Sequence, residues 1–207
     1  MAGIGEHIHT DQAIAAADAY LAEDDVLQAA RQRAAEVGLT LAPPSTGATL
    51  RFLAALLDAR SVVEVGTGTG VSGIWLLRGM RPDGVLTSVD PDPEYQRLAR
   101  AAYTEAGVPA NRARLIAGRP LEVLPRLTDG GYDLISVCAD PLEYADYLRE
   151  APRLLRDGGV AVFADPTNAS PGAMRELGKA LLASEEFAAV LLPIGTGLLA
   201  ATKRPIR

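Results

Sequence analysis

The chain has 207 residues, of which 48% are hydrophobic and 22% charged, a composition typical of one soluble globular domain. Its formal net charge is −6, which disfavours nucleic acid as a partner because binding to a phosphate backbone requires basic surface. The single cysteine excludes an internal disulfide. Both histidines, His7 and His9, lie at the extreme N-terminus, which disfavours a zinc centre or a histidine-based catalytic triad in the core.

The N-terminal residues contain no basic stretch followed by an apolar one, so we expect no secretory leader and a cytoplasmic protein. No apolar run reaches the ~18 residues that would cross a bilayer, so no membrane partner is expected. Helical spacing predicts helices over 11–20 and 24–37, the second ended by Gly38. They form the N-terminal segment, 1–42, of a single domain over 1–207.

The rest of the chain, 43–207, is expected to form the core of this domain. Pro43 and Pro44 cannot lie inside a helix, so the next helix is predicted over 49–59. Short apolar runs then predict strands at 61–66, 85–90, 113–117, 132–140, 159–165, 187–194 and 198–203. The intervening helices are expected over 71–78, 93–106, 121–127, 144–155 and 171–184.

Alternating strands and helices are typical of an α/β fold with a mostly parallel sheet and helices on both faces. The turn at 195–197 is too short for a crossover, so the last two strands must form an antiparallel hairpin. The predicted fold is a Rossmann-like, seven-stranded, mostly parallel sheet with an antiparallel C-terminal hairpin strand and additional N-terminal helices.

The N-terminal helices also indicate how the protein assembles. They carry a stripe of apolar residues at Leu21, Val26, Leu27, Ala30 and Ala34, although the helices of the core already cover both faces of the sheet. A second subunit is the simplest cover for this stripe, so we expect a homodimer.

The most informative motif is 64–70, Glu-Val-Gly-Thr-Gly-Thr-Gly, between the first strand and its helix. Glycines allow a ligand to approach the backbone, and the following helix directs free amides at that ligand. Asp90 lies 20 residues beyond Gly70, where a carboxylate can accept both hydroxyls of a ribose, and the Ser72 hydroxyl can donate to a carboxylate. The alternative is that the glycines only form a turn and Asp90 only caps a helix.

Two nucleotide cofactors are compatible with this motif. Gly68, Gly70 and Gly73 match GxGxxG, which would indicate a dinucleotide, but the match is out of register because Gly66 already ends the strand. The pattern E-x-G-x-G-x-G, with an acid ending the next strand and a closing antiparallel hairpin, is typical of S-adenosylmethionine-dependent methyltransferases.

An ordered series of stretches extends this likeness over nearly the whole chain, from Asp24 to Lys203. The stretches at 62–77, 86–94, 121–125, 132–140, 153–165 and 191–203 resemble the small bacterial O-methyltransferases of the caffeoyl-CoA and catechol O-methyltransferase type. The resemblance implies S-adenosylmethionine as cofactor, S-adenosylhomocysteine as product, and a small hydroxylated, phenolic or catechol-like molecule as methyl acceptor.

The resemblance also implies cofactor contacts. Glu64 would lie near the methionine amino group, Ser72 would hold the methionine carboxylate, and Asp90 would hold the ribose. The complete implied cofactor-binding set is Ala42, Glu64, Gly66, Thr67, Gly68, Gly70, Ser72, Asp90 and Asp140.

The sequence departs from the family at the positions where the family binds a divalent metal. Cys138 replaces the first acid after the fourth strand, and Asp165-Pro166 replaces an Asp-Asn pair after the fifth. A thiol and a proline are poor ligands for hard cations, so we expect no tightly bound divalent metal, although Asp140 and Asn168 lie nearby in the sequence.

A further departure is Arg119, where the family has an aspartate that meets the adenine amino group. Arginine cannot accept a hydrogen bond, so this side chain either stacks on the adenine or turns outward.

The departures leave the catalytic base unassigned and two functions open: an active O-methyltransferase, or a weak or inactive S-adenosylmethionine-binding protein of the same fold. Cys138 is interpreted as a small core residue and not a nucleophile, because no histidine can activate it. Tyr144 and Tyr147 could pack a planar acceptor, but packing of their own helix is favoured, and Trp75 is expected in the core.

Overall fold

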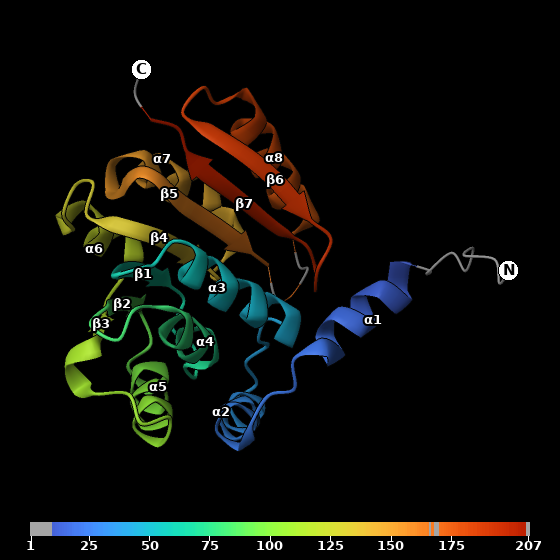
Figure 1. The fold of residues 1–207 in the computed structure, drawn as a ribbon, viewed down its shortest axis with the longest axis vertical. Coiled ribbons are helices and arrows are strands. Elements are labelled where there is room, and N and C mark those ends of the chain that lie inside the picture. The colour runs from blue at the N-terminus through green and yellow to red at the C-terminus, as the bar shows by residue number, and fades with distance from the viewer. Residues whose placement is uncertain (1–9, 166, 168–169, 206–207) are drawn as a thin grey trace, which may run out of the picture.

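The computed structural model describes residues 10–165, 167 and 170–205, and over these residues the chain folds around one seven-stranded sheet (Figure 1). The strands follow the order β3-β2-β1-β4-β5-β7-β6 across the sheet. The first five in that order are parallel, and β7 is antiparallel to both of its neighbours, which confirms the predicted sheet with its closing hairpin. The strands are β1 (Ser61–Val65), β2 (Val85–Asp90), β3 (Ala113–Ala117), β4 (Tyr132–Val137), β5 (Leu155–Ala164), β6 (Phe187–Leu192) and β7 (Leu198–Lys203).

Helices cover both faces of this sheet. The helices are α1 (Thr10–Tyr20), α2 (Asp25–Glu36), α3 (Pro44–Leu56), α4 (Val71–Gly79), α5 (Pro93–Glu105), α6 (Pro120–Val123), α7 (Tyr144–Leu154) and α8 (Pro171–Ala183). Short 3₁₀ turns lie at η1 (Ala110–Arg112), η2 (Leu124–Arg126) and η3 (Pro141–Glu143). Helices α3, α4 and α5 pack against one face and α7 and α8 against the other. Within the described residues, no helix is long and apolar enough to cross a membrane.

The central strand β1 shows how the sequence produces these two layers. Val62 packs with the α3–α5 layer, whereas Val63 and Val65 pack with the α7–α8 layer, as the period of two in a strand requires. Glu64 shares the face of Val62 and is fully buried beneath the start of α4. A carboxylate in this apolar layer is costly, so its position beside the glycine loop is significant.

Helix α2 is part of the core of the chain itself. The Asp24 carboxylate accepts a hydrogen bond from the Leu27 amide at 3.1 Å and caps the helix. Leu27, Ala30 and Ala34 are buried within the chain, and the Thr69 hydroxyl donates to the Ala30 carbonyl at 2.8 Å. These three residues therefore need no second subunit to cover them, because α2 packs on α4 and α5, and the prediction that a partner subunit covers them is wrong.

Two prolines shift the third helix from its predicted position. Helix α3 begins at Pro44 instead of residue 49, because a proline is well tolerated in the first turn, where its missing amide would have no partner within the helix. Pro43 is the N-cap residue, and the helix ends at Leu56, before residue 59. The earlier start places Thr46 and Gly47 inside the helix.

The connections around β4 and β5 also differ from the predicted elements. The predicted helix over 121–127 divides into α6 and η2. Strand β4 ends at Val137 instead of residue 140, and Asp140 is the N-cap residue of η3. Strand β5 begins at Leu155 instead of residue 159 and runs through Gly158 and Gly159. The pairing register between β4 and β5 shifts at this point, and such an irregularity accommodates residues that would otherwise break the strand.

Candidate functional site

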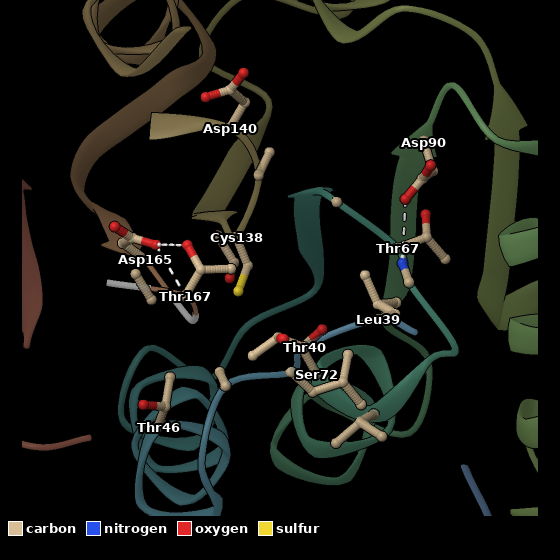
Figure 2. A pocket seen from close by; sticks show the side chains of 18 of the residues that line it. Leu39, Thr40, Thr46, Thr67, Ser72, Asp90, Cys138, Asp140, Asp165 and Thr167 are labelled. Carbon is tan, nitrogen blue, oxygen red and sulfur yellow. Dashed lines mark hydrogen bonds between the residues drawn. The ribbon is translucent and has the colours of Figure 1, made fainter. Parts of the chain in front are cut away.

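A cavity of about 470 Å³ opens where the parallel strands end. The loops that follow β1, β2, β4 and β5 line it, together with the connection between α2 and α3. Figure 2 shows Asp90 and Thr67 on one side of this cavity and Cys138, Asp165 and Thr167 on the other. The carboxyl edge of an open parallel sheet is where ligands of such folds bind.

Most of the predicted cofactor-binding residues meet in this cavity. The predicted residues that line it are Ala42, Gly66, Thr67, Gly68, Ser72, Asp90 and Asp140. Glu64 and Gly70 do not line it. Gly70 instead allows α4 to approach α5, since a Cβ atom there would lie 3.0 Å from the Tyr103 ring and 3.1 Å from the Ala99 Cα.

The glycine loop has a backbone that other residues would strain. Gly66 has φ +91, and a Cβ atom there would lie 2.2 Å from the carbonyl oxygen of Cys138. Gly68 has φ +49, and its Cβ position lies 3.1 Å from Leu39. These contacts show why the turn after β1 requires glycine, and they place the α2–α3 connection directly over the loop.

Asp90 ends β2 with its carboxylate buried at the cavity wall, where 6% of the residue is exposed. Its Oδ2 accepts a hydrogen bond from the Gly68 amide at 3.1 Å, and its Oδ1 accepts one from the Asp92 amide at 3.0 Å. Burial raises the pKa of Asp90, while these backbone donors favour its charged form. The carboxylate therefore joins the glycine loop to β2 and presents acceptors at the cavity.

Glu64 supports the loop from behind the cavity. The Ser88 hydroxyl donates to its Oε2 at 2.6 Å, and Ser88 is also hydrogen bonded to the Thr67 hydroxyl at 2.6 Å. Burial raises the pKa of Glu64 to about 7, against the opposing effect of the Ser72 and Ser88 hydroxyls. Its Oε1 has no hydrogen-bond partner among the described residues. A buried carboxyl group with a spare oxygen suits a polar ligand atom close to Ser72.

The opposite wall of the cavity contains an uncharged thiol at Cys138 and a buried tyrosine at Tyr147. Burial raises the pKa of the Cys138 thiol to about 12, and the nearby Glu64 and Asp165 carboxylates add to this effect. The thiol therefore stays protonated, in agreement with its interpretation as a packing residue and not a nucleophile. Tyr147 is buried at the same wall and its hydroxyl donates to the Glu143 carboxylate.

Of the aromatic residues and the arginine considered in the sequence, some pack in the core, some line the cavity and one faces outward. Tyr144 packs against Phe163 and donates to the Ala164 carbonyl at 2.7 Å, so it belongs to the core, whereas Tyr147 lines the cavity. Trp75 is buried as expected. Arg119 turns outward, does not line the cavity, and lies 4.0 Å from the Glu122 carboxylate.

Asp165 is the described acidic residue at the position where the family binds a divalent metal. Asp165 is 2% exposed, and its Oδ1 accepts hydrogen bonds from the amide and hydroxyl of Thr167 at 3.0 and 2.7 Å. Its Oδ2 accepts one from the Ser170 amide at 3.2 Å. Across residues 10–165, 167 and 170–205, no group of three or more His, Cys, Asp and Glu side chains could hold a metal ion. Pro166 and Asn168, named above with the metal positions, lie outside the described residues.

Apart from Ala42, the sequence did not predict the part of the cavity wall that is built by the N-terminal segment and the start of α3. The residues of this part that were not predicted include Arg31, Leu39, Thr40, Leu41 and Thr46. One feature of the sequence could have indicated this part of the wall. The stretch between Gly38 and the double proline is rich in turn-forming residues and belongs to no predicted helix or strand, as is common for loops that line a binding site. These residues and the glycine loop are far apart in the sequence, so no local sequence pattern predicts that they meet.

The fold and the site together define a Rossmann-like methyltransferase: a parallel sheet closed by an antiparallel hairpin, with a glycine loop and a strand-ending carboxylate at one cavity. A model of the O-methyltransferase family matches residues 14–204. The chain therefore belongs to the O-methyltransferase family.

Relatives in sequence and structure agree with this assignment. A protein of Mycolicibacterium smegmatis named "Putative O-methyltransferase" is 46% identical over 198 residues, which cover 90% of this chain and 94% of the relative. A crystal structure from Corynebacterium glutamicum has a TM-score of 0.85 at 28% identity and covers 96% of this chain and 99% of its own. The O-methyltransferase TomG of Streptomyces achromogenes, solved in complex with SAM, has a TM-score of 0.79 at 27% identity, with 91% and 96% covered.

Proposed function

We propose that the chain is a single methyltransferase domain, with an N-terminal segment over 1–42 and a core over 43–207, that binds S-adenosylmethionine and methylates an oxygen atom of a small acceptor. The observation that carries this proposal is the convergence of Asp90 and the glycine loop on one cavity of about 470 Å³. The complex of TomG with SAM supports it, because that relative shares the fold.

The cavity offers a partner for each polar part of this cofactor. Asp90 would accept the two ribose hydroxyls, and Gly66 and Thr67 would line the cofactor with their backbone. Ser72 and the first turn of α4 would hold the carboxylate. Glu64 braces the loop from behind the cavity and would lie near the amino group. The residues that would shape the rest of the cofactor site are Ala42, Gly68, Gly70 and Asp140.

Catalysis in this site consists mainly of alignment. S-adenosylmethionine, when bound, supplies a methyl group on a positively charged sulfur. The cavity would hold the cofactor and the acceptor together, so that the acceptor oxygen lies in line with the methyl group. The acceptor hydroxyl must also lose its proton, and the site assigns that step to no particular base.

A small phenolic or catechol-like acceptor fits the wall opposite Asp90. Tyr147 presents a buried ring there, next to Ala139 and Pro141, so a planar molecule would be packed by apolar surface. The product with S-adenosylmethionine would be a methyl ether and S-adenosylhomocysteine.

The second candidate function is an S-adenosylmethionine-binding protein with weak or no catalysis. The observation that favours this function concerns Asp165. Both of its carboxylate oxygens accept hydrogen bonds from the loop that follows β5, which leaves this carboxylate less available for catalysis. Binding of S-adenosylmethionine without turnover over a broad panel of hydroxylated acceptors would favour this function. Turnover with any acceptor on the panel would favour the enzyme.

The experiment that tests cofactor binding is calorimetry on the Asp90→Ala variant. The variant removes the acceptor for the ribose hydroxyls, so affinity for S-adenosylhomocysteine should fall by about 1–3 kcal/mol, or roughly 5- to 150-fold. Asp92→Ala is the matched control, because Asp92 caps α5 without lining the cavity. Unchanged affinity in the Asp90 variant would refute the assigned role of this residue.

Methyl transfer is expected to continue in the presence of EDTA. At the expected metal position, the chain offers a protonated thiol and a carboxylate that is already hydrogen bonded. The binding energy from these two ligands would not offset the cost of dehydrating Mg²⁺ or Ca²⁺. Elemental analysis of the purified protein, with activity measured before and after chelation, checks this. A stoichiometric ion bound through Asp165 would contradict it.

We still propose a homodimer, but the residues that support it are now exposed hydrophobic residues on α1 and α3. Tyr20 on α1 is 85% exposed, and Phe52 and Leu56 on the neighbouring α3 are 63% and 68% exposed. Light scattering should give twice the chain mass of 21.7 kDa at micromolar concentration. A double Tyr20→Ser, Phe52→Ser variant should shift toward monomer, and a monomeric wild type would contradict the proposal.

A further inference from the structure

Arg31 occupies an unusual place in the cavity. Of the described residues that line the cavity, it alone is cationic, whereas four carboxylates reach the same space, at Asp90, Asp140, Glu143 and Asp165. It lies on α2, outside the glycine motif, and no local sequence pattern indicates a role for it. A single cation in an acidic cavity is the natural partner of any negative group on the ligand.

The guanidinium of Arg31 is held in one orientation. Its Nε and Nη2 donate to the two carboxylate oxygens of Glu23, the second at 2.8 Å. The Glu23 side chain is 7% exposed, does not line the cavity, and accepts a further hydrogen bond from Trp75 Nε1 at 3.2 Å. The carboxylate therefore lies behind the guanidinium, and Arg31 Nη1 takes no part in this pair.

The same contacts connect Arg31, through Glu23, to Trp75 on α4. Trp75 lies one turn after Ser72, so both residues share one face of α4, and both line the cavity. The N-cap of α4 is Gly70, which has no side chain to bind the free amides of the first turn. The cavity that Arg31 lines therefore also offers two other kinds of anion-binding group: a hydroxyl at Ser72 and the uncapped amides at the start of α4.

We propose that Arg31 binds the carboxylate of the amino-acid end of the cofactor, together with Ser72 and the first turn of α4. This inference rests on the proposed function, because it requires a cofactor with an amino-acid end in this cavity. The fixed guanidinium makes the site selective: ligands that carry the carboxylate gain a charge-assisted hydrogen bond, and ligands that lack it do not.

Calorimetry with two ligands tests this role. S-adenosylhomocysteine carries the amino-acid end, and 5′-methylthioadenosine has the same nucleoside without it. The Arg31→Gln variant should bind S-adenosylhomocysteine about 10- to 100-fold more weakly and 5′-methylthioadenosine as tightly as the wild type does. Arg33→Gln is the matched control, because Arg33 lies on the same helix, pairs with Glu105 and does not line the cavity.

A second variant separates binding from folding. Arg31→Gln leaves the buried Glu23 without its partner, so the double variant Glu23→Gln, Arg31→Gln removes both charges while keeping an acceptor for Trp75. It should show the same selective loss. Equal weakening of both ligands, or unchanged affinity for S-adenosylhomocysteine, would overturn the role of Arg31. Failure of the wild type to bind S-adenosylhomocysteine would overturn the proposed function as well.

Discussion

The Gly66→Ala variant is expected to lose about 2–5 kcal/mol of unfolding free energy. Two costs contribute. Gly66 has φ +91, a conformation that costs an L-residue about 1–2 kcal/mol. Its Cβ would also lie 2.2 Å from the carbonyl oxygen of Cys138, and this neighbour is backbone, so β1 and β4 would have to move apart where Cys138 N donates to Val65 O at 2.9 Å. Urea denaturation measures the loss.

Gly38→Ala provides the matched control for this prediction. Gly38 has φ +69, but a Cβ atom there meets nothing within 4 Å. This variant should therefore lose only the conformational cost of about 1–2 kcal/mol. If both variants lost the same free energy, the close contact between Gly66 and Cys138 would have no energetic consequence, and the account of the glycine loop would be wrong.

The Glu64→Gln variant is expected to change how stability depends on pH. Burial raises the pKa of Glu64 from 4.5 to about 7, so the folded chain favours the protonated side chain. The stabilisation by this proton is fully present below pH 4.5 and is lost as the pH rises through 7. The amide of the variant cannot titrate, so between pH 4.5 and pH 8 the variant should gain about 3 kcal/mol relative to the wild type.

Urea denaturation of both proteins across this pH range checks the prediction. Glu122→Gln is a suitable control, because Glu122 is an exposed acid outside the cavity, and its stability curve should follow that of the wild type. Parallel curves for the wild type and the Glu64 variant would mean that Glu64 has the same pKa in the folded and unfolded chains.

Local patterns in the sequence were sufficient to predict the sheet and much of the cavity. The apolar strands ending at Val65 and Asp90 are fixed by short-range periodicity, and the glycine loop follows because only glycine tolerates its backbone conformation. Since parallel strands end at a common edge, residues far apart in the sequence, such as Ser72 and Asp140, could be expected at one site. The structure places both in the same cavity.

The features that the sequence did not predict depend on long-range packing. Arg31 and Leu39 reach the cavity because α2 packs on α4 and α5, and helical periodicity reveals an apolar face without naming what covers it. The early start of α3 at Pro44 has a local cause, since a proline forbidden inside a helix is favourable in its first turn. The close approach of α5 to Gly70 is likewise long-range, and no local pattern around this glycine indicates it.

A crystal structure of the chain grown with S-adenosylhomocysteine would show whether this cavity binds the cofactor. We expect the ligand in the cavity at the carboxyl edge of the sheet, with its ribose hydroxyls on the Asp90 carboxylate and its amino-acid carboxylate beside Ser72. A ligand bound elsewhere, or a cavity left empty at saturating S-adenosylhomocysteine, would contradict the claim that this cavity is a methyltransferase cofactor site.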